Sequence, residues 1–167
     1  MEEKVVYIDN QKFVLPEVSD IREHWIQVRE GIQDILDANP QLTFLPEDVY
    51  SECVNGRATL MLSPIGFLVL TQEVDQFTQD KTLLIWIAYT YEKGKHNWIT
   101  HHEWFEQLAI ELDCKFIEAR SSVPAMEEYA LNNGWKLDTR ISVSYTHLRA
   151  HETLRYRVCR LVGEKKK

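Results

Sequence analysis

Apolar residues recur at helical spacing in the stretch between residues 20 and 39. They follow one another at alternating four- and three-residue intervals, which marks one face of an amphipathic helix. The positions in this stripe are Ile21, Trp25, Val28, Ile32 and Ile35. Asp20 with Glu23 forms a capping box at the start of the helix, and the Asn39-Pro40 pair ends it.

A second, shorter helix is predicted from Pro46, because proline is favoured in the first turn of a helix. Val49 and Cys53 lie one turn apart and face inward. The Asn55-Gly56 pair then stops the helix. Upstream of both helices, the apolar stretches Val5–Ile8 and Phe13–Leu15 predict a small hairpin or a first strand.

The middle of the chain changes to the pattern of strands. Ala58–Leu62 and Phe67–Glu73 flank a turn at Ser63–Gly66 that contains proline and glycine, which predicts a β-hairpin. Thr82–Tyr91 is apolar almost without alternation. Such a run is typical of a strand that is buried on both faces at the centre of a sheet.

A helix and another strand follow this central strand. Thr100 and Glu103 have capping-box spacing, and Ile99 and Trp104 have hydrophobic-staple spacing, so a helix is predicted to begin near Thr100. Its buried stripe is predicted to be Trp104, Phe105, Leu108, Ala109 and Leu112. Lys115–Arg120 is a short strand. The two strands are expected to run parallel with a right-handed crossover.

The pattern after residue 120 predicts one more helix and one more strand. The helix runs from about Pro124 to Asn132, and Gly134 stands where a left-handed C-cap is needed. Trp135–Ile141 then resumes the alternation of a strand. Together these elements predict an α+β domain built on a mixed sheet.

The last 25 residues resemble translated sequencing adapter rather than protein. Val143–Thr153 is similar to one reading frame of a common transposon adapter used in sequencing libraries. Val158–Leu161, followed by Glu164–Lys167, is similar to the flow-cell end of that adapter running into poly-A. We therefore expect a metagenomic gene fragment with one domain at 1–142 and an artefactual tail at 143–167, truncated beyond about Ser142. Such segments are set aside before the fold is considered.

Without the tail at 143–167, the net charge of the remaining chain is more negative. The tail holds 7 of the 19 Lys+Arg and 2 of the 26 Asp+Glu, so residues 1–142 keep 12 basic and 24 acidic groups, a net charge of −12. A domain this acidic repels phosphate backbones, and no basic patch offsets this, so nucleic-acid binding is not expected. The tail's His147 and His151, at metal-ligand spacing with Cys159 nearby, are also set aside, and no metal site is predicted.

The remaining composition indicates where the protein works. Cys53 and Cys114 lie far apart in the sequence, which favours a reducing, intracellular compartment with both thiols acting as small apolar side chains. No apolar run approaches the 18 to 20 residues or so that cross a bilayer, and no signal peptide opens the chain. A cytoplasmic protein without a membrane partner is expected.

Three segments carry a resemblance to a known family. They are Phe116–Ser122, then Met126–Tyr129, then Asn133–Lys136. With the order of elements before them, they resemble the GNAT acyltransferases, in which a strand feeds a short helix closed by Gly-Phe or a similar pair. The resemblance covers roughly Asp20–Ile141. More narrowly, the chain is similar to small GNAT-like proteins of phages and prophages, including an internal virion protein family of short-tailed phages.

The resemblance implies a GNAT-like acyl-CoA N-acyltransferase fold, truncated at its C-terminus, with acetyl-CoA as coenzyme. In the family, backbone N–H groups at the start of the helix after the central strand bind the pyrophosphate of coenzyme A, through a Q/R-x-x-G-x-G/A loop. The matching stretch here, Glu92–Thr100, holds one glycine. The implied coenzyme-binding residues are Ala88, Tyr89, Thr90, Lys93, Gly94, Lys95 and Thr100. Lys93 and Lys95 either meet the phosphates or belong to a solvated loop.

Two residues are candidates for catalysis. Tyr129 lies one residue away from the family's usual general-acid position, so it is either that acid or a packing residue. Glu73, which closes the strand before the central one, either deprotonates the acceptor amine through water or is an exposed hairpin carboxylate. His101 and His102 are adjacent on a helix and point about 100° apart, so surface or capping roles are expected for them. The tryptophans Trp86, Trp98, Trp104 and Trp135 are expected in the core.

Two functions remain open at this point. The first is an acetyl-CoA-dependent N-acyltransferase of phage or prophage type with a degenerate coenzyme site and an amine-bearing acceptor. The second is a non-catalytic GNAT-fold protein that serves virion assembly or binds a phage or host protein. The first would work in the host cytoplasm, and the second would also be found in the virion. A fold alone does not choose between them.

Overall fold

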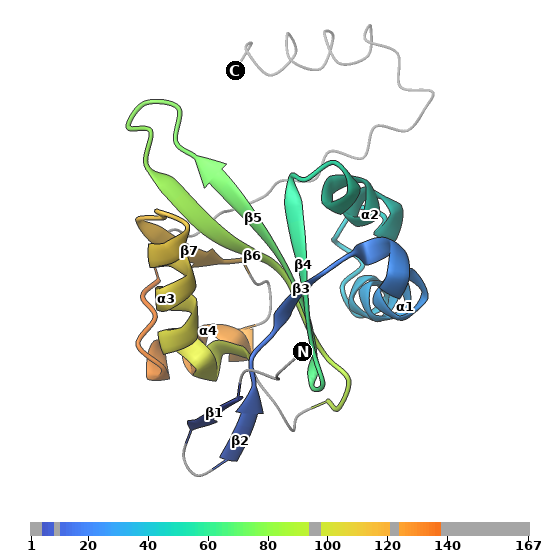
Figure 1. Cartoon of the computed structure of the whole chain (residues 1–167), viewed down its shortest axis with the longest axis horizontal. Coiled ribbons are helices and arrows are strands. Elements are labelled where there is room, and N and C mark those ends of the chain that lie inside the picture. The colour runs from blue at the N-terminus through green and yellow to red at the C-terminus, as the bar shows by residue number, and fades with distance from the viewer. Residues whose placement is uncertain (1–4, 9–10, 94–97, 121–123, 138–167) are drawn as a thin grey trace, which may run out of the picture. The chain divides into compact units, whose positions relative to one another are not determined.

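The structure, a computed structural model, describes residues 5–8, 11–93, 98–120 and 124–137; side chains are described for 14–93, 98, 101–120, 127–128 and 130–137. A five-stranded sheet has the order β3-β4-β5-β6-β7, and β1 pairs with β2 in a separate two-stranded sheet. Figure 1 shows α1 and α2 on one side of the larger sheet and α3 on the other. The helices thus cover two faces of one mixed sheet, as the pattern predicted.

The first helix, α1 (Ile21–Ala38), follows the predicted stripe: Ile21, Val28 and Ile32 are buried. The carboxylate of Asp20 accepts the N–H of Arg22 at 2.9 Å and so caps the helix. The second helix, α2 (Pro46–Val54), also has its predicted bounds, and it buries Val49 completely. None of the described helices is long and apolar enough to cross a membrane.

The strands before the central one agree with the expected hairpins. At the N-terminus β1 (Val5–Ile8) pairs with β2 (Gln11–Val14), and further on β4 (Ala58–Ser63) pairs with β5 (Gly66–Val74), both antiparallel. The sequence did not predict β3 (Glu17–Ser19), which pairs with β4. Three residues are too few to produce a periodic signal.

The central strand, β6 (Lys81–Thr90), pairs antiparallel with β5 and parallel with β7 (Phe116–Ala119). The parallel register runs from Thr82 opposite Phe116 to Ile85 opposite Ala119. The helix α3 (His102–Glu111) connects the two parallel strands and buries Phe105 and Ala109. The predicted parallel strand–helix–strand unit is therefore confirmed.

The helix starts near Thr100, as predicted, but Thr100 is not the N-cap residue that its capping-box spacing had indicated. Thr100 lies inside η1, a 3₁₀ turn at Trp98–His101, and the N-cap residue of α3 is His101, which makes no side-chain capping bond. Trp98 explains the shift, because its indole is 3% exposed and donates Nε1–H to the Tyr89 carbonyl at 3.0 Å. Burial of this large side chain in a tight turn outweighs the local capping preference of Thr100.

The last described helix is α4 (Pro124–Asn132), with the predicted bounds, and Gly134 has the expected positive φ of 87°. Residues 135–137 form no strand. The rest of the predicted Trp135–Ile141 strand lies outside the described residues. At the end of α3, Leu112 is the C-cap residue and 37% exposed, although its spacing had placed it in the buried stripe.

A β-bulge in β6 changes which residues face which helices. Val69 and Leu70 are neighbours on β5, but their partners on β6 are Ile87 and Ile85, so Trp86 is an extra residue in β6. Ile85 belongs to the apolar core with α3, whereas Ile87 belongs to the core with α1 and α2. Without an extra residue, positions two apart in a strand would share a face. After the bulge, the residues of β6 that would have faced α3 therefore face α1 and α2 instead.

The α1 side of the sheet requires a glycine at position 31. A Cβ atom there would lie 2.6 Å from Phe67 Cε1 and 3.0 Å from Tyr89 Cδ1. Phe67 is fully buried, and its ring stacks on Tyr89 with 5.2 Å between centroids. The absence of a side chain lets the helix approach this ring pair closely.

We predict that Gly31→Ala destabilises the protein by about 1–3 kcal/mol, the usual cost of overpacking. The gain of about 1 kcal/mol in helix propensity opposes this cost. Phe67→Leu in the same chain makes room for the methyl group, so the double variant should lose less than the sum of the two single losses. Urea unfolding of the four proteins measures this coupling. A Gly31→Ala protein more stable than the parent would show that the contact is not tight.

Candidate functional site

The described pairing between β6 and β7 covers only the first part of β6. The register ends at Ile85 opposite Ala119, while β6 continues to Thr90. The bulge at Trp86 comes directly after the last paired residue. Within the described residues, the β7-facing edge of β6 therefore has no strand partner from residue 86 onward. Bulges are common beside functional sites, because a bulge can interrupt the pairing of a strand and leave backbone groups available.

Backbone groups of Ala88 and Thr90 point to this open edge. Tyr91 donates its N–H to the Ile65 carbonyl at 3.0 Å, and in an antiparallel pair the bonded residues alternate. Tyr89 therefore directs its backbone groups toward β5. Ala88 and Thr90 direct theirs the other way, to the β7-facing edge of β6, beyond the end of the described β6–β7 pairing. An extended ligand lying along β6 could bond to these groups as a strand does.

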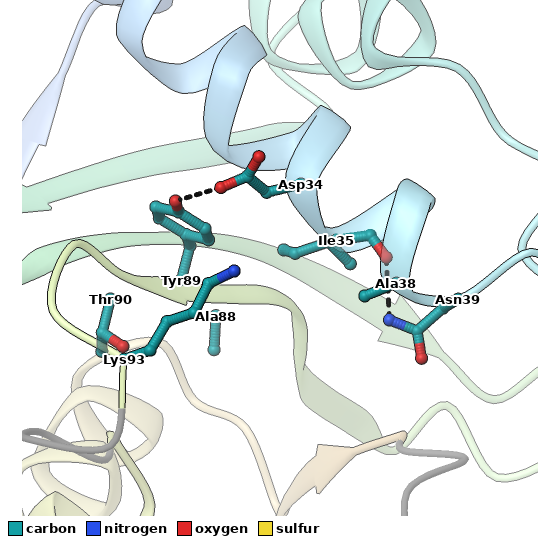
Figure 2. Close-up of a pocket in the computed structure, with 8 residues that line it drawn as sticks. All are labelled: Asp34, Ile35, Ala38, Asn39, Ala88, Tyr89, Thr90 and Lys93. Carbon is teal, nitrogen blue, oxygen red and sulfur yellow. Dashed lines mark hydrogen bonds between the residues drawn. The ribbon is translucent and has the colours of Figure 1, made fainter.

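A pocket of about 210 Å³ lies between the last turns of α1 and the end of β6. Figure 2 shows that the Tyr89 ring points up to α1, while the side chains of Ala88 and Thr90 point to the opposite side of β6. The residues that line the pocket are Asp34, Ile35, Ala38, Asn39, Ala88, Tyr89, Thr90 and Lys93. Four of the predicted coenzyme-binding residues are thus brought together here: Ala88, Tyr89, Thr90 and Lys93.

Asp34 and Tyr89 form the central polar contact of the pocket. The Tyr89 hydroxyl donates to Asp34 Oδ2 at 2.8 Å. This hydrogen bond is the main reason why the pKa of Tyr89 is raised, and partial burial and the carboxylate charge raise this pKa further. The phenol therefore stays protonated at neutral pH and holds the carboxylate in place. Sequence reasoning did not identify Asp34, because 55 residues separate it from Tyr89.

The remaining polar groups of the pocket come from both sides. Asn39 donates Nδ2–H to the Ile35 carbonyl at 2.8 Å, which leaves its amide oxygen available. The Lys93 side chain extends toward the Tyr89 ring (Figure 2) and makes no ion pair with any described residue. The pocket thus offers acceptors from α1 and one ammonium from the segment after β6.

Glu73 lies at the other end of the sheet. It is opposite Thr82 in the β5–β6 register, six residues of β6 before Ala88, which is about 20 Å of strand. Arg120 binds it with two contacts, Nη2–Oε2 at 2.7 Å and Nη1–Oε1 at 3.3 Å, and also donates Nε–H to Glu118 at 2.6 Å. These bonds raise the pKa of Arg120. The structure thus does not bring Glu73 together with the pocket residues.

Of the other predicted site residues, Gly94 and Lys95 lie outside the described residues. Tyr129 lies in α4 and Thr100 in η1, and the side chains of both lie outside what the structure describes. Among described residues, His102 Nε2 pairs with Glu106 at 3.2 Å, and its ring lies 5.4 Å from that of Trp135. No group of three or more His, Cys, Asp or Glu able to hold a metal is found in the described part.

Several solved structures with a similar fold are described as acetyltransferases. Brucella melitensis ribosomal-protein-alanine N-acetyltransferase has a TM-score of 0.60 and 11% identity, covering 80% of this chain and 100% of its own. An aminoglycoside acetyltransferase from an uncultured soil metagenomic sample, solved with sisomicin, has a TM-score of 0.58 and 10% identity, covering 81% and 96%.

A Trypanosoma brucei acetyltransferase has a TM-score of 0.56 and 12% identity, covering 79% and 99%. No family model matches the sequence, and no curated protein matches it significantly. Because the identities are this low, the likeness concerns the fold. The described chain has the fold of the GNAT acetyltransferases, as the sequence resemblance implied.

We predict that Tyr89→Phe lowers the free energy of unfolding at pH 8 by about 0.5–1.5 kcal/mol, the usual worth of one hydrogen bond. Tyr91→Phe is the matched control, because no described residue forms a hydrogen bond with the Tyr91 hydroxyl. Thermal unfolding measures both losses. Equal losses in the two variants would contradict a role for the Asp34 contact.

The hydrogen bond between Tyr89 and Asp34 also predicts how the stability of the protein depends on pH. The folded-state pKa of Tyr89 is raised, so the hydrogen bond contributes fully below the unfolded pKa of about 10. Its contribution is lost as the pH rises through the raised pKa, because the unfolded chain gives up the phenolic proton first. The stability difference between the parent and Tyr89→Phe should therefore shrink above pH 10.

Proposed function

We propose that this chain is an N-acyltransferase that takes an acyl group from acetyl-CoA and transfers it to an amine. The observation that carries the proposal is that the described β6–β7 pairing ends at Ile85, while the backbone groups of Ala88 and Thr90 point to the β7-facing edge of β6. Ala88 and Thr90 also line a pocket together with residues of α1. A strand edge with unpaired donors and acceptors fits the amide groups of a pantetheine arm.

The segment that follows β6 also offers positive charge for the phosphates of the coenzyme. Lys93 follows β6 and makes no ion pair with described residues, so its ammonium could meet a phosphate. The helical turn η1 and the helix α3 come next, and the first N–H groups of a helix favour anions. Bound acetyl-CoA would supply the acyl group as a thioester. Gly94, Lys95 and Thr100 remain proposed members of this coenzyme site.

We propose Tyr129 as the general acid of the reaction. It lies in α4, which follows β7 in the chain. A tyrosine can protonate the departing thiolate of coenzyme A. Glu73 remains a proposed base that acts through water, although Arg120 holds it at the other end of β6.

The second candidate is a non-catalytic GNAT-fold protein of phage type that serves virion assembly or binds a host protein. The segment after β6 favours it, because the stretch Glu92–Thr100 holds a single glycine where the related loops hold two. A degenerate loop of this kind would weaken phosphate binding. The expected locations are the host cytoplasm for the enzyme and, in addition, the virion for the scaffold.

Titration of the full chain with acetyl-CoA decides between the two candidates. We expect measurable heat, with binding weakened about 3- to 10-fold in Ala88→Pro, which removes one N–H worth about 0.5–1.5 kcal/mol. The proline should spare the β5–β6 pairing, because the Ala88 N–H points away from β5. Thermal unfolding checks that the variant remains folded. Absence of heat at millimolar acetyl-CoA would leave only the scaffold.

We also propose that residues 143–167 take no part in this function, since they resemble translated adapter. Deleting them should leave the affinity for acetyl-CoA unchanged, and soluble yield and melting temperature report separately on folding. A folded truncation that no longer binds the coenzyme would show instead that the tail contributes to the site.

A further inference from the structure

Asp34 is the carboxylate of the pocket between α1 and β6. Among the residues that line this pocket it alone is acidic, and it lies there together with Ala88 and Thr90. Glu73, the base that the sequence suggested, is opposite Thr82 on β6, about 20 Å of strand before Ala88, and is bound by Arg120. Of these two carboxylates, only Asp34 lines the pocket that the proposed coenzyme site includes.

One oxygen of the Asp34 carboxylate is fixed and the other is available. Oδ2 accepts the Tyr89 hydroxyl at 2.8 Å (Figure 2), while Oδ1 forms no hydrogen bond or ion pair with any described residue. Asp34 is exposed, so water and a dissolved amine can reach the available oxygen. A general base needs both features, because one group must orient it while its lone pair faces the substrate.

Tyr89 is itself held on two sides, which suits it to orient this carboxylate. Its ring stacks on the buried ring of Phe67 with 5.2 Å between centroids, and its backbone carbonyl accepts the indole N–H of Trp98 at 3.0 Å. The hydroxyl therefore donates to Asp34 from a fixed position. A base whose direction is set by a third group is typical of enzymes that activate a nucleophile by removing its proton.

Lys93 shares the pocket without neutralising Asp34. The two side chains make no ion pair, and Lys93 is exposed and carries its charge on a flexible stem. In the proposed function its ammonium meets a phosphate of the coenzyme. The space beside the Asp34 carboxylate is then left to the acceptor.

We infer that Asp34 is the general base that deprotonates the acceptor amine, with Tyr89 as the residue that positions it; this inference rests on the proposed acyl transfer. The carboxylate takes one proton from the acceptor ammonium, and the freed nitrogen lone pair attacks the thioester carbonyl carbon. The C–N bond forms and the C–S bond breaks. The departing thiolate takes a proton from Tyr129, which regains one from the nitrogen of the new amide. Asp34 then releases its proton to water.

The test uses two amines that each carry one ring and one amino group. At neutral pH 2-phenylethylamine is an ammonium ion and needs a base, whereas 4-methoxyaniline is uncharged. Mass spectrometry follows acetyl transfer from acetyl-CoA to each amine by the full chain. Asp34→Asn keeps an oxygen for the Tyr89 hydroxyl, and it should lower kcat about 100-fold or more for 2-phenylethylamine but no more than about threefold for 4-methoxyaniline.

Two further variants accompany this comparison. Tyr89→Phe keeps the carboxylate but not its orientation, so it should lower kcat for 2-phenylethylamine by about tenfold, again more than for 4-methoxyaniline. Asp37→Asn is the matched control, because Asp37 is an exposed carboxylate three residues further along α1 that does not line the pocket. It should leave both rates unchanged.

A pH profile separates the loss of a base from a structural change. An alkylamine with a pKa near that of lysine, about 10.4, becomes about tenfold more deprotonated with each pH unit below that value. The rate of Asp34→Asn with 2-phenylethylamine should follow this rise, and the parent rate should not.

Two kinds of result would count against the inference. Equal losses for the two amines in Asp34→Asn, no loss at all, or a parent that acetylates only 4-methoxyaniline would overturn the role of Asp34 and leave the acyltransferase standing. A parent that transfers the acetyl group to neither amine would instead reject the proposed function, and the base with it.

Discussion

The extra residue at Trp86 in β6 is the constraint on which the rest of the site depends. Before it, Leu83 and Ile85 face the core with α3; after it, Ile87 faces the core with α1 and α2. The same reversal turns Tyr89 toward α1, where its hydroxyl reaches Asp34. With regular alternation, Tyr89 would share the face of Leu83 and Ile85, and neither the Asp34 contact nor the pocket would exist.

Packing on both faces of the sheet fixes the part of β6 that follows the bulge. On the α1 side, Gly31 lets the helix approach the stacked rings of Phe67 and Tyr89. On the α3 side, the buried indole of Trp98 bonds to the Tyr89 carbonyl. Tyr89 is thus held by its ring, hydroxyl and carbonyl, while its neighbours Ala88 and Thr90 keep their backbone groups directed to the open edge. A rigid strand with an available edge suits an extended ligand, because little ordering is needed on binding.

Local patterns in the sequence predicted most of the elements, and contacts between distant residues account for what was missed. The stripe of α1 and the parallel pairing of β6 with β7 followed from periodicity and element order, and both are confirmed. The bulge was not predictable, because a strand that is apolar at nearly every position looks the same with or without a change of face. Asp34 and Gly31 were not identified from the sequence, because both lie on α1 and contact Tyr89, which lies on β6 and is distant in the sequence. The N-cap of α3 is His101 and not Thr100, which reflects the burial of Trp98 in the preceding turn, a contact that a capping rule does not include.

Amide hydrogen exchange along β6 tests the central claim most directly. The account predicts slow exchange at Tyr89, whose N–H points to β5, and fast exchange at Ala88 and Thr90, whose N–H groups point to the open edge. Addition of acetyl-CoA should then slow exchange at Ala88 and Thr90 and leave Tyr89 unchanged. Protection of Ala88 and Thr90 equal to that of Tyr89 in the ligand-free protein would contradict the account, because the edge would then already be paired.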